Sequence, residues 1–355
     1  MDDQWPVLST EPLEDDTGLL QRAHTVLAWL VQYYAHSIPT GELVRIPKPL
    51  AVPLVRVSGI LRIAPILTFA DTVLWNARPV DPRRPLSVDN ICFENIFSGT
   101  EDEKNFYKLS ASVELGAVEA VQIIQRYLNL DDPRDRINES GMRSDLVRLK
   151  GVLEDLTGLM ADVKEAVDPR VFYWQVRPWF NGSGGGGGEK WVYEGVAESA
   201  VVDTSGPSAG QSPIMHAIDA FLEVDHREGC PIPSVRKQHK DLAFMDRMRR
   251  YMPGTHRDFL ERLDEVPVTI KKVAMERSSL REAYNDAVKA LKKLRDIHIR
   301  IACLYIISMA RSQPPDGFRR REAALALDGS IGTGGNHVAS LLKAGRDATQ
   351  KAILE

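Results

Sequence analysis

The sequence predicts an all-α protein, and three observations lead to this prediction. Apolar residues recur every three or four positions over several long segments, which is the spacing of a helix with one buried face. No segment shows the alternation of apolar and polar residues that marks a half-buried strand, and no internal repeat is present. The 355 residues, 43% of them hydrophobic, suffice for a large core in one big domain or two modest ones.

The N-terminal part is expected to hold two helices separated by a connector. Thr17 can cap the first helix, and Pro65 stands near the start of the second, over residues 64–77. Residues 46–57, IPKPLAVPLVRV, are rich in proline and are expected to be extended. The apolar positions with helical spacing in the first helix are Leu20, Ala23, Leu27, Leu30 and Tyr34.

A capping box, Thr100 with Glu103, predicts the start of the next helix. A further long helix is expected from Gly141 to Val167, where Asp168–Pro169 ends it. We place a boundary between a small N-terminal domain, residues 1–97, and a larger domain, residues 98–355. Five consecutive glycines within residues 181–190 predict a flexible surface loop. The stripe behind the capping box contains Phe106, Ser110, Val113, Ala117, Val121, Ile124 and Leu128.

Composition excludes several classes of function. The net charge is −4, and no basic tract is dense enough to indicate a nucleic-acid partner. No apolar run approaches the length that spans a membrane, and the acidic N-terminus is not a secretory signal. The three cysteines, Cys92, Cys230 and Cys303, form neither a disulfide framework nor a zinc pattern, which fits a reducing cytosol. We therefore expect a cytoplasmic protein without a nucleic-acid or membrane partner, present as a monomer or a weak homo-oligomer.

One histidine interrupts an apolar helical stripe in LKKLRDIHIRIACLYI, residues 291–306. The stripe steps by three and four residues, and His298 fills the slot between Leu294 and Ile301. A buried imidazole needs hydrogen-bond partners for both nitrogens, or it needs a metal. On the helix alone, a structural histidine is favoured over a metal or haem ligand. The other stripe positions are Leu280, Tyr284, Ala287, Leu291 and Tyr305.

The segment VFYWQVRPWF, residues 171–180, combines five aromatic residues with the arginine Arg177. Pro178 disfavours helix at the residue before it, so Arg177 is expected at a helix end. An arginine beside rings suits an aromatic ligand that carries a carboxylate, because the guanidinium pairs with the acid while the rings stack on the remainder. The alternative is an arginine that stacks on structural aromatics.

Two segments of small residues precede helices. DTSGPSAGQS, residues 203–212, could let a flat ligand approach the backbone, or could be an ordinary loop. SIGTGG, residues 330–335, precedes the C-terminal helix but lacks the lysine of a phosphate-binding loop. It could be a mobile loop over a pocket, residues 328–337, or a helix-initiating turn. The other histidines show no spacing typical of a metal site.

Taken together, these segments resemble the indoleamine 2,3-dioxygenases. The resemblance runs from PLEDDTGLLQRAHTVL to the C-terminus, which is nearly the whole chain. No single tetrapeptide is decisive, but the order and combination of the matches are highly specific. The strongest matches are PILTFADTVL, DPRRPLSVDNI, VYEG, SAGQS, MRRYMPGTHRDFL, LREAYNDAVKALKKLRDIHIRI, and GTGG followed by RDAT.

The resemblance implies a helical protein that holds haem b and uses O2 to open the indole 2,3-bond of L-tryptophan or a related indole, giving N-formylkynurenine from tryptophan. His298 would be the axial ligand of the haem iron, with Arg295 near a propionate and Asp219 in the same polar network. Ser208 would lie over the haem. No general base is needed for this reaction, which suits the absence of a catalytic histidine or carboxylate in the distal segments.

The resemblance also implies a substrate pocket. Arg177 would bind the substrate carboxylate, Phe172 would pack against the indole, and Thr333 with Gly334 would belong to the loop that closes the site. The full set implied for the pocket is Phe69, Thr72, Phe106, Ser110, Phe172, Arg177, Phe180, Ala209, Thr333 and Gly334.

Several positions depart from the family pattern. Phe69 stands where the family often has tyrosine, Thr72 where the mammalian enzymes have cysteine, and Phe180 where a smaller aliphatic residue is usual. Pro207 replaces a glycine and removes a backbone N–H donor, and Asn336–His337 replace the usual polar pair. These changes concern the choice of indole rather than haem binding.

The chain also begins later than family members usually do, so we expect a shortened small domain. Two alternatives therefore stay open at this point. One is a haem protein that binds O2 or signals without turning over tryptophan. The other is an enzyme of secondary metabolism that acts on a modified indole.

Overall fold

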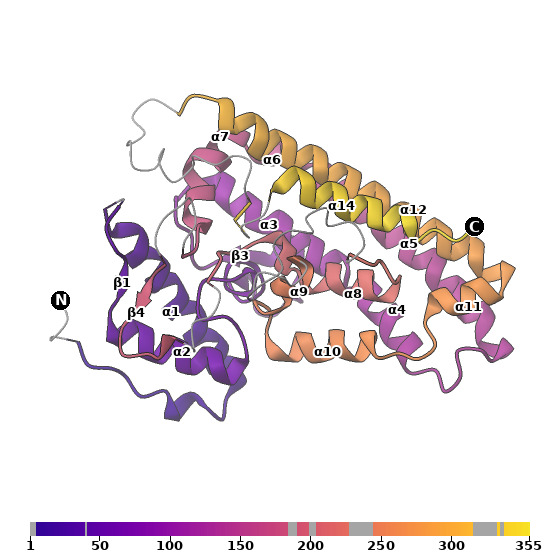
Figure 1. The fold of residues 1–355 in the computed structure, drawn as a ribbon, viewed down its shortest axis with the longest axis horizontal. Coiled ribbons are helices and arrows are strands. Elements are labelled where there is room, and N and C mark those ends of the chain that lie inside the picture. Colours follow the sequence, from indigo (N-terminus) through magenta and orange to yellow (C-terminus); the bar gives the residue numbers. More distant parts are fainter. Residues whose placement is uncertain are drawn as a thin grey trace, which may run out of the picture.

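Helices make up nearly all of the regular structure in the described part of the chain, so the all-α prediction is confirmed (Figure 1). The computed structural model describes residues 5–39, 41–183, 190–198, 204–226, 244–314, 332–333 and 337–355. Two very short strand pairs accompany the helices. β1 (Arg45–Ile46) pairs in parallel with β4 (Val192–Tyr193), and β2 (Ala77–Pro79) pairs antiparallel with β3 (Ile91–Phe93).

The N-terminal part differs from the sequence expectation in three ways. The N-cap of α1 (Thr17–Ser37) is Asp16, whose carboxylate accepts from the Leu19 N–H at 3.0 Å, and not Thr17. The expected connector at residues 46–57 is instead mostly helical, because α2 (Lys48–Leu61) starts with proline in its first turn, where no N–H is needed. Burial of apolar residues on one face of α2 outweighs the hydrogen bond lost at Pro53. The expected helix over 64–77 shrinks to a π-helical segment, η2 (Ala70–Leu74).

The capping box is confirmed on one side only. The Thr100 hydroxyl accepts from the Glu103 N–H at 3.2 Å and so starts α3 (Glu101–Gly116). The Glu103 carboxylate does not return to Thr100 but accepts from the N–H groups of Phe97, at 2.8 Å, and Ser98, at 2.6 Å. Ala117 separates α3 from α4 (Val118–Leu128), so the predicted continuous stripe lies on two helices.

The two longest helices lie side by side (Figure 1). The helix expected over 141–167 is observed as α5 (Glu139–Ala161), with α6 (Val163–Ala166) after it, and α12 (Ser278–Ala302) packs along α5. The C-terminal α14 (Val338–Lys351) packs on α12. The other helices are η1 (Glu11–Leu13), η3 (Val88–Asn90), η4 (Arg136–Asn138), α7 (Pro169–Val171), η5 (Phe172–Val176), η6 (Arg177–Phe180), η9 (Ala209–Gln211), α8 (Pro213–Phe221), α9 (Phe244–Arg249), α10 (Gly254–Asp264), α11 (Ile270–Glu276), η10 (Cys303–Ser308) and η11 (Met309–Arg311).

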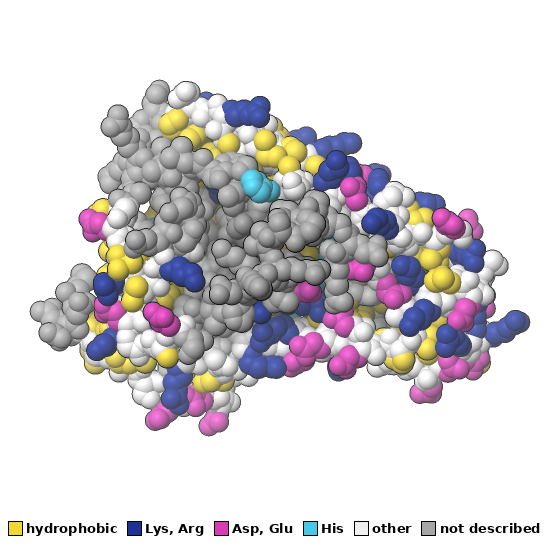
Figure 2. All heavy atoms as spheres, in the orientation of Figure 1, with side chains coloured by type: hydrophobic (Ala, Val, Ile, Leu, Met, Phe, Trp, Pro, Cys, Tyr) yellow, Lys and Arg dark blue, Asp and Glu magenta, His cyan; other side chains and the backbone are white. Residues whose placement is uncertain are grey.

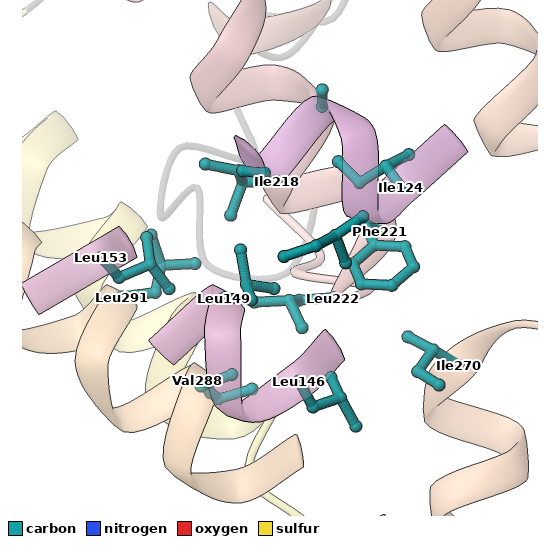
Figure 3. Packing of buried hydrophobic residues seen from close by; sticks show 14 of the residues in the cluster. Ile124, Leu146, Leu149, Leu153, Ile218, Phe221, Leu222, Ile270, Val288 and Leu291 are labelled. Carbon is teal, nitrogen blue, oxygen red and sulfur yellow. The ribbon is translucent and has the colours of Figure 1, made fainter. Parts of the chain in front are cut away.

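Two large hydrophobic clusters hold these helices together. The first joins α4, α5, α8, α11, α12 and α14, and Figure 3 shows Leu149, Leu153, Ile218 and Leu291 converging in it. The second joins α1, α2, α3 and the segments η5, η6 and η10, and it contains most of the aromatic residues predicted for the pocket. The division into domains 1–97 and 98–355 stays a prediction.

The surface carries charges of both signs. Figure 2 shows Lys and Arg side chains interspersed with Asp and Glu over this face, outside the part drawn in grey. Among the described residues, no helix is both long and apolar enough to cross a membrane.

Candidate functional site

His298 lies near the end of α12, where the buried stripe opens. Leu291 and Leu294, two turns and one turn earlier, are buried, whereas the His298 side chain is partly exposed. No described residue forms a hydrogen bond with its imidazole. Burial, aided by the positive charge of Arg295, lowers the pKa of His298 to about 4. The ring is therefore neutral at physiological pH, and a neutral imidazole nitrogen is the form that can ligate iron.

Arg295, one turn before His298, anchors a buried polar network. Its guanidinium pairs with both carboxylate oxygens of Asp219 on α8, at 2.5 and 2.6 Å, and donates to the Gly345 carbonyl on α14 at 2.7 Å. His226 approaches the same carboxylate at 2.8 Å. Burial alone would raise the pKa of Asp219, but the positive charge of Arg295 brings it below its ordinary value. Arg295 and Asp219 thus share one polar network, which fixes α12 between α8 and α14.

Three π-helical segments occur in the described residues, and each adjoins residues predicted for the site. η2 follows Phe69 and contains Thr72, η5 begins at Phe172, and η10 continues α12 beyond His298. A π-turn closes a hydrogen bond between residues five apart, which widens the helix, and such turns are frequent at functional sites. In η5 the Arg177 N–H donates to the Phe172 carbonyl, so the widened turn sets Arg177 one turn above Phe172.

The predicted pocket aromatics meet in one cluster. The ring centroids of Phe106 and Phe172 are 4.7 Å apart, and those of Phe106 and Phe180 are 5.9 Å apart. Tyr305, from η10, packs edge-on against Phe172 at 5.8 Å. Phe69 belongs to the same cluster, and Ile301 of α12 packs against it. The cluster therefore reaches from α3 to the helix that carries His298.

Arg177 is buried, with 4% of its surface exposed, at the junction of η5 and η6. Its predicted place at a helix end is confirmed. The guanidinium carbon lies 5.2 Å from the centre of the Tyr173 ring, so the cation–π contact expected for a structural arginine is present. This contact holds the charge in place beside the aromatic cluster and is compatible with a role in anion binding.

The other aromatics of residues 171–180 have structural contacts. Trp179 stacks on Phe97 at 5.0 Å, and Phe97 stacks on Trp29 of α1 at 4.0 Å. Trp174 donates through its indole N–H to the Ser312 hydroxyl at 3.0 Å. The first and last rings of the segment, Phe172 and Phe180, thus belong to the aromatic cluster. The rings between them contact other parts of the protein.

The loop around Ser208 lies against η6. The Cβ that would be added at Gly206 lies 1.7 Å from the Phe180 carbonyl oxygen, so only glycine fits. The small residue here lets another backbone approach closely, and the approach of a flat ligand to residues 203–212 stays a prediction. Ser208 accepts from the Gly210 N–H at 3.2 Å, and Ala209 is exposed.

The predicted closing loop is described only in part. The Thr333 hydroxyl donates to the Pro207 carbonyl at 2.7 Å, so this residue does reach the Ser208 loop. Gly334 and most of residues 328–337 lie outside the described residues, as do residues 184–189 of the glycine loop.

The α3 side of the site shows one residue that sequence reasoning missed. Phe106 and Ser110 are half-buried, and the Ser110 hydroxyl donates to the Phe106 carbonyl at 3.0 Å. Glu114, the next residue at a spacing of four, accepts a 2.5 Å hydrogen bond from the Ser212 hydroxyl. Burial raises the pKa of Glu114 to about 7. The signal that could have identified Glu114 was an acid four residues after Ser110, next to the apolar position Val113.

Asp71 and Gln211 were also missed. Asp71 lies between the pocket candidates Phe69 and Thr72, and Gln211 accepts from the Phe69 N–H at 2.8 Å. The signal for Asp71 was an acid inside the apolar segment PILTFADTVL. Nothing in the sequence near Gln211 indicated that its partner lies more than a hundred residues away.

Comparison with known proteins shows which family the chain belongs to. The family model described as indoleamine 2,3-dioxygenase matches residues 2–352. Indoleamine 2,3-dioxygenase 1 of Rattus norvegicus is 32% identical, over 98% of this chain and 83% of the relative. A protein named myoglobin from Haliotis madaka is 31% identical, over 93% of this chain and 80% of the relative. A 6-hydroxytryptophan 2,3-dioxygenase of Fusarium equiseti is 26% identical, over 98% of this chain and 84% of the relative. With a match over nearly its whole length, the chain belongs to the indoleamine 2,3-dioxygenase family of oxidoreductases.

Proposed function

We propose that this protein is a haem-dependent dioxygenase that opens the 2,3-bond of L-tryptophan or a related indole to give an N-formylkynurenine-type product. The observation that carries this proposal is the placement of His298. A neutral imidazole without a hydrogen-bond partner among the described residues lies on the helix that adjoins the buried aromatic cluster containing Phe172 and Phe180.

The residues around His298 fit a haem b group. The imidazole offers a nitrogen ligand, and the adjoining apolar surface of Ile301 and the aromatic cluster suits a porphyrin face. Arg295 is held by Asp219 with its cationic head group near the same end of α12, where it would pair with a propionate. When bound, the haem iron supplies the activation of O2 that no amino-acid side chain provides.

The chain itself would place the substrate. Arg177 would hold the substrate carboxylate, because its buried guanidinium keeps its full charge in a site of low dielectric. Phe172 and Phe106 would orient the indole through ring contacts. Thr333, bonded to Pro207, would bring the closing loop over the ligand and exclude water. Phe69, Thr72, Phe180, Ser110 and Ala209 would define the ring end of the pocket, and Ser208 would lie over the haem.

Two alternatives have specific support. The relative named myoglobin favours a haem protein that binds O2 without opening an indole. The relative named 6-hydroxytryptophan 2,3-dioxygenase favours a modified indole as substrate, and Phe69 and Thr72 are the positions where this choice would be made.

One assay separates the three functions. The purified protein, reconstituted with haem and reduced, is mixed with O2 and either L-tryptophan or ring-substituted tryptophans, and product absorbance is followed. Formation of N-formylkynurenine from L-tryptophan supports the proposal, and turnover of substituted rings alone supports the modified-indole function. A stable oxygenated haem spectrum with no product from any indole overturns the enzymatic proposal in favour of O2 binding.

A further inference from the structure

The Asp71 carboxylate is the centre of a fully buried polar cluster. One oxygen lies 2.7 Å from the His24 Nδ1 and accepts from the Thr25 hydroxyl at 3.2 Å. The other accepts from the Thr68 N–H at 2.9 Å and from the Thr68 hydroxyl at 2.8 Å. Both oxygens of Asp71 are therefore engaged by side chains or backbone of two separate segments, α1 and residues 64–69.

His24 completes this cluster. Its Nδ1 lies beside the Asp71 carboxylate, and its Nε2 lies 3.2 Å from the Ala64 carbonyl oxygen. Both ring nitrogens therefore have a partner within the cluster, and His24 and Asp71 are each 0% exposed. A buried polar cluster is costly to desolvate, and its best-attested use is to fix one conformation rather than to add stability.

The conformation fixed here is that of a proposed pocket wall. Asp71 lies within η2, two residues after Phe69 and one before Thr72. The Trp29 indole N–H donates to the Asp71 carbonyl at 3.0 Å, so α1 holds both the side chain and the backbone of this residue. The Thr72 hydroxyl is turned back to the Thr68 carbonyl at 3.2 Å, inside the same turn.

Gln211 connects this wall to the loop that contains Ser208. Its side-chain oxygen accepts from the Phe69 N–H at 2.8 Å, and its side-chain nitrogen donates to the Gly206 carbonyl at 2.9 Å. Gln211 is buried and follows the segment that contains Ser208. One amide therefore fixes the separation between Phe69 and the Ser208 loop.

We propose that Asp71 and Gln211 are positioning residues that determine which indole rings the pocket accepts. This inference rests on the proposed function. The two side chains act through Phe69 and Thr72, whose backbone they hold, and not by contact with the substrate. A shift of the wall by a fraction of an ångström changes the room at the ring end of the pocket and leaves the His298 side unaltered.

The test uses variants that keep the protein folded. Asp71→Asn alters the centre of a fully buried cluster, including the contact with His24, and can prevent folding, so the milder changes Thr68→Val and Gln211→Met are used. Thr68→Val removes one donor to Asp71, and Gln211→Met removes both bonds of the amide. Asn90→Ala is the matched control, because Asn90 is equally buried and its side chain bonds only to residues 81–85.

The readout is the ratio of kcat/KM for L-tryptophan to kcat/KM for a ring-hydroxylated tryptophan, with KM and kcat also compared separately. We expect Thr68→Val and Gln211→Met to change this ratio by about 10-fold, since small misplacements of substrate carry rate effects of this order or more. The haem spectrum should stay that of the wild type. Asn90→Ala should lower Tm and leave the ratio unchanged.

Failure of this inference is distinguishable from failure of the proposed function. A wild-type protein that discriminates between the two substrates, with Thr68→Val and Gln211→Met ratios within about twofold of it, overturns the positioning role alone. The same holds if Asn90→Ala moves the ratio as far as they do. A haem-loaded wild type that opens no indole overturns the proposed function, and the inference falls with it.

Discussion

The helix α12 and the pocket walls are built on different principles. We use "pocket walls" for residues 64–76, 172–183 and 204–212. α12 is one regular helix whose buried stripe repeats every three or four residues up to Leu294. The walls contain two π-helical segments, η2 and η5, and two 3-10 turns, η6 and η9. Their buried residues show little regular spacing.

This difference shows where the free energy of each region comes from. α12 is stabilised by apolar surface buried against α5 and α14, which is non-directional and tolerates small adjustments. The walls depend on single directed contacts, such as the Gln211 amide on the Phe69 N–H and the backbone approach at Gly206. A directed contact such as a hydrogen bond fixes the positions of its two partners more narrowly than apolar burial does. Its loss therefore affects mainly the residues around it. The helix therefore gives the site a stable base, while the walls give it shape.

The largest effect is expected from a substitution that removes the proposed iron ligand on α12. His298→Ala should abolish the Soret band of the purified, haem-supplied protein, because it removes the imidazole nitrogen that would ligate iron. The circular dichroism spectrum should remain helical, since His298 holds no other described residue by a hydrogen bond.

A histidine outside α12 provides the control. His256→Ala should keep the Soret band, because His256 lies on α10 and belongs to neither side of the site. A normal haem spectrum in His298→Ala would rule out the ligand assignment.

The next largest effect is expected from a substitution in the pocket walls. Arg177→Ala should raise KM for L-tryptophan by about 10- to 100-fold, the cost of losing a charge-assisted hydrogen bond to the carboxylate. Tryptamine, which lacks the carboxylate, should be affected far less, and Arg177→Lys should recover part of the loss. Steady-state kinetics on the two substrates gives the result. Equal effects on both would assign Arg177 to the Tyr173 stack only.

A backbone test sharpens the contrast in stability. Gly206→Ala should lower the free energy of unfolding by about 1–3 kcal/mol or more, because the new methyl group overlaps the Phe180 carbonyl. Gly151→Ala, in the middle of α5 with open space around its Cα, should instead raise it by about 0.5–1 kcal/mol. Urea unfolding measures both. Equal changes in the two variants would remove the distinction between wall and helix.

The smallest effect concerns pH and Glu114. Burial raises the pKa of Glu114 from 4.5 in the unfolded chain to about 7. The folded protein then holds a proton that the unfolded chain releases, so the free energy of unfolding falls as pH rises from 4.5 to 7 and levels off above. Glu114→Gln should remove this fall, by up to about 3 kcal/mol between pH 5 and 8.

The control for Glu114 is an exposed acid on α5. Glu154→Gln should leave the pH dependence of stability unchanged, because Glu154 is exposed. Identical pH slopes in Glu114→Gln and the wild type would mean that Glu114 is not held protonated.

The two regions also differ in how far the sequence predicts them. The stripe from Leu280 to Leu294 has one period and one buried face, so the helix follows from spacing alone. The partial exposure of His298 does not, because the spacing placed His298 within the same buried stripe. The break before Pro169 follows from the constraint that proline places on the preceding residue, because Asp168 is extended. Arg177 keeps a helical backbone before Pro178, so its place at the junction of η5 and η6 has another cause.

The walls were predicted less well because their structure depends on distant partners. Residues 64–68 are not helical, and there the Asp71 carboxylate accepts from the Thr68 N–H. The helix α2 forms despite Pro49 and Pro53 because α1 buries its face. Asp71, Gln211 and Glu114 have partners on other segments, which no local pattern reports. The pocket residues were named through the resemblance to the family, and spacing alone would have yielded only Arg177 and its aromatic neighbours.

The contact between Gly206 and Phe180 bears on how the protein can be redesigned. The Ser183 N–H donates to the Thr204 carbonyl at 2.8 Å, and Cβ atoms at Gly182 and Gly206 would each strike the facing backbone. The two strips of chain are thus joined along their main chains. In chimeras with other family members, a crossover point between the two strips would combine two backbones that do not fit each other. Exchanging both strips in one block keeps this backbone contact intact.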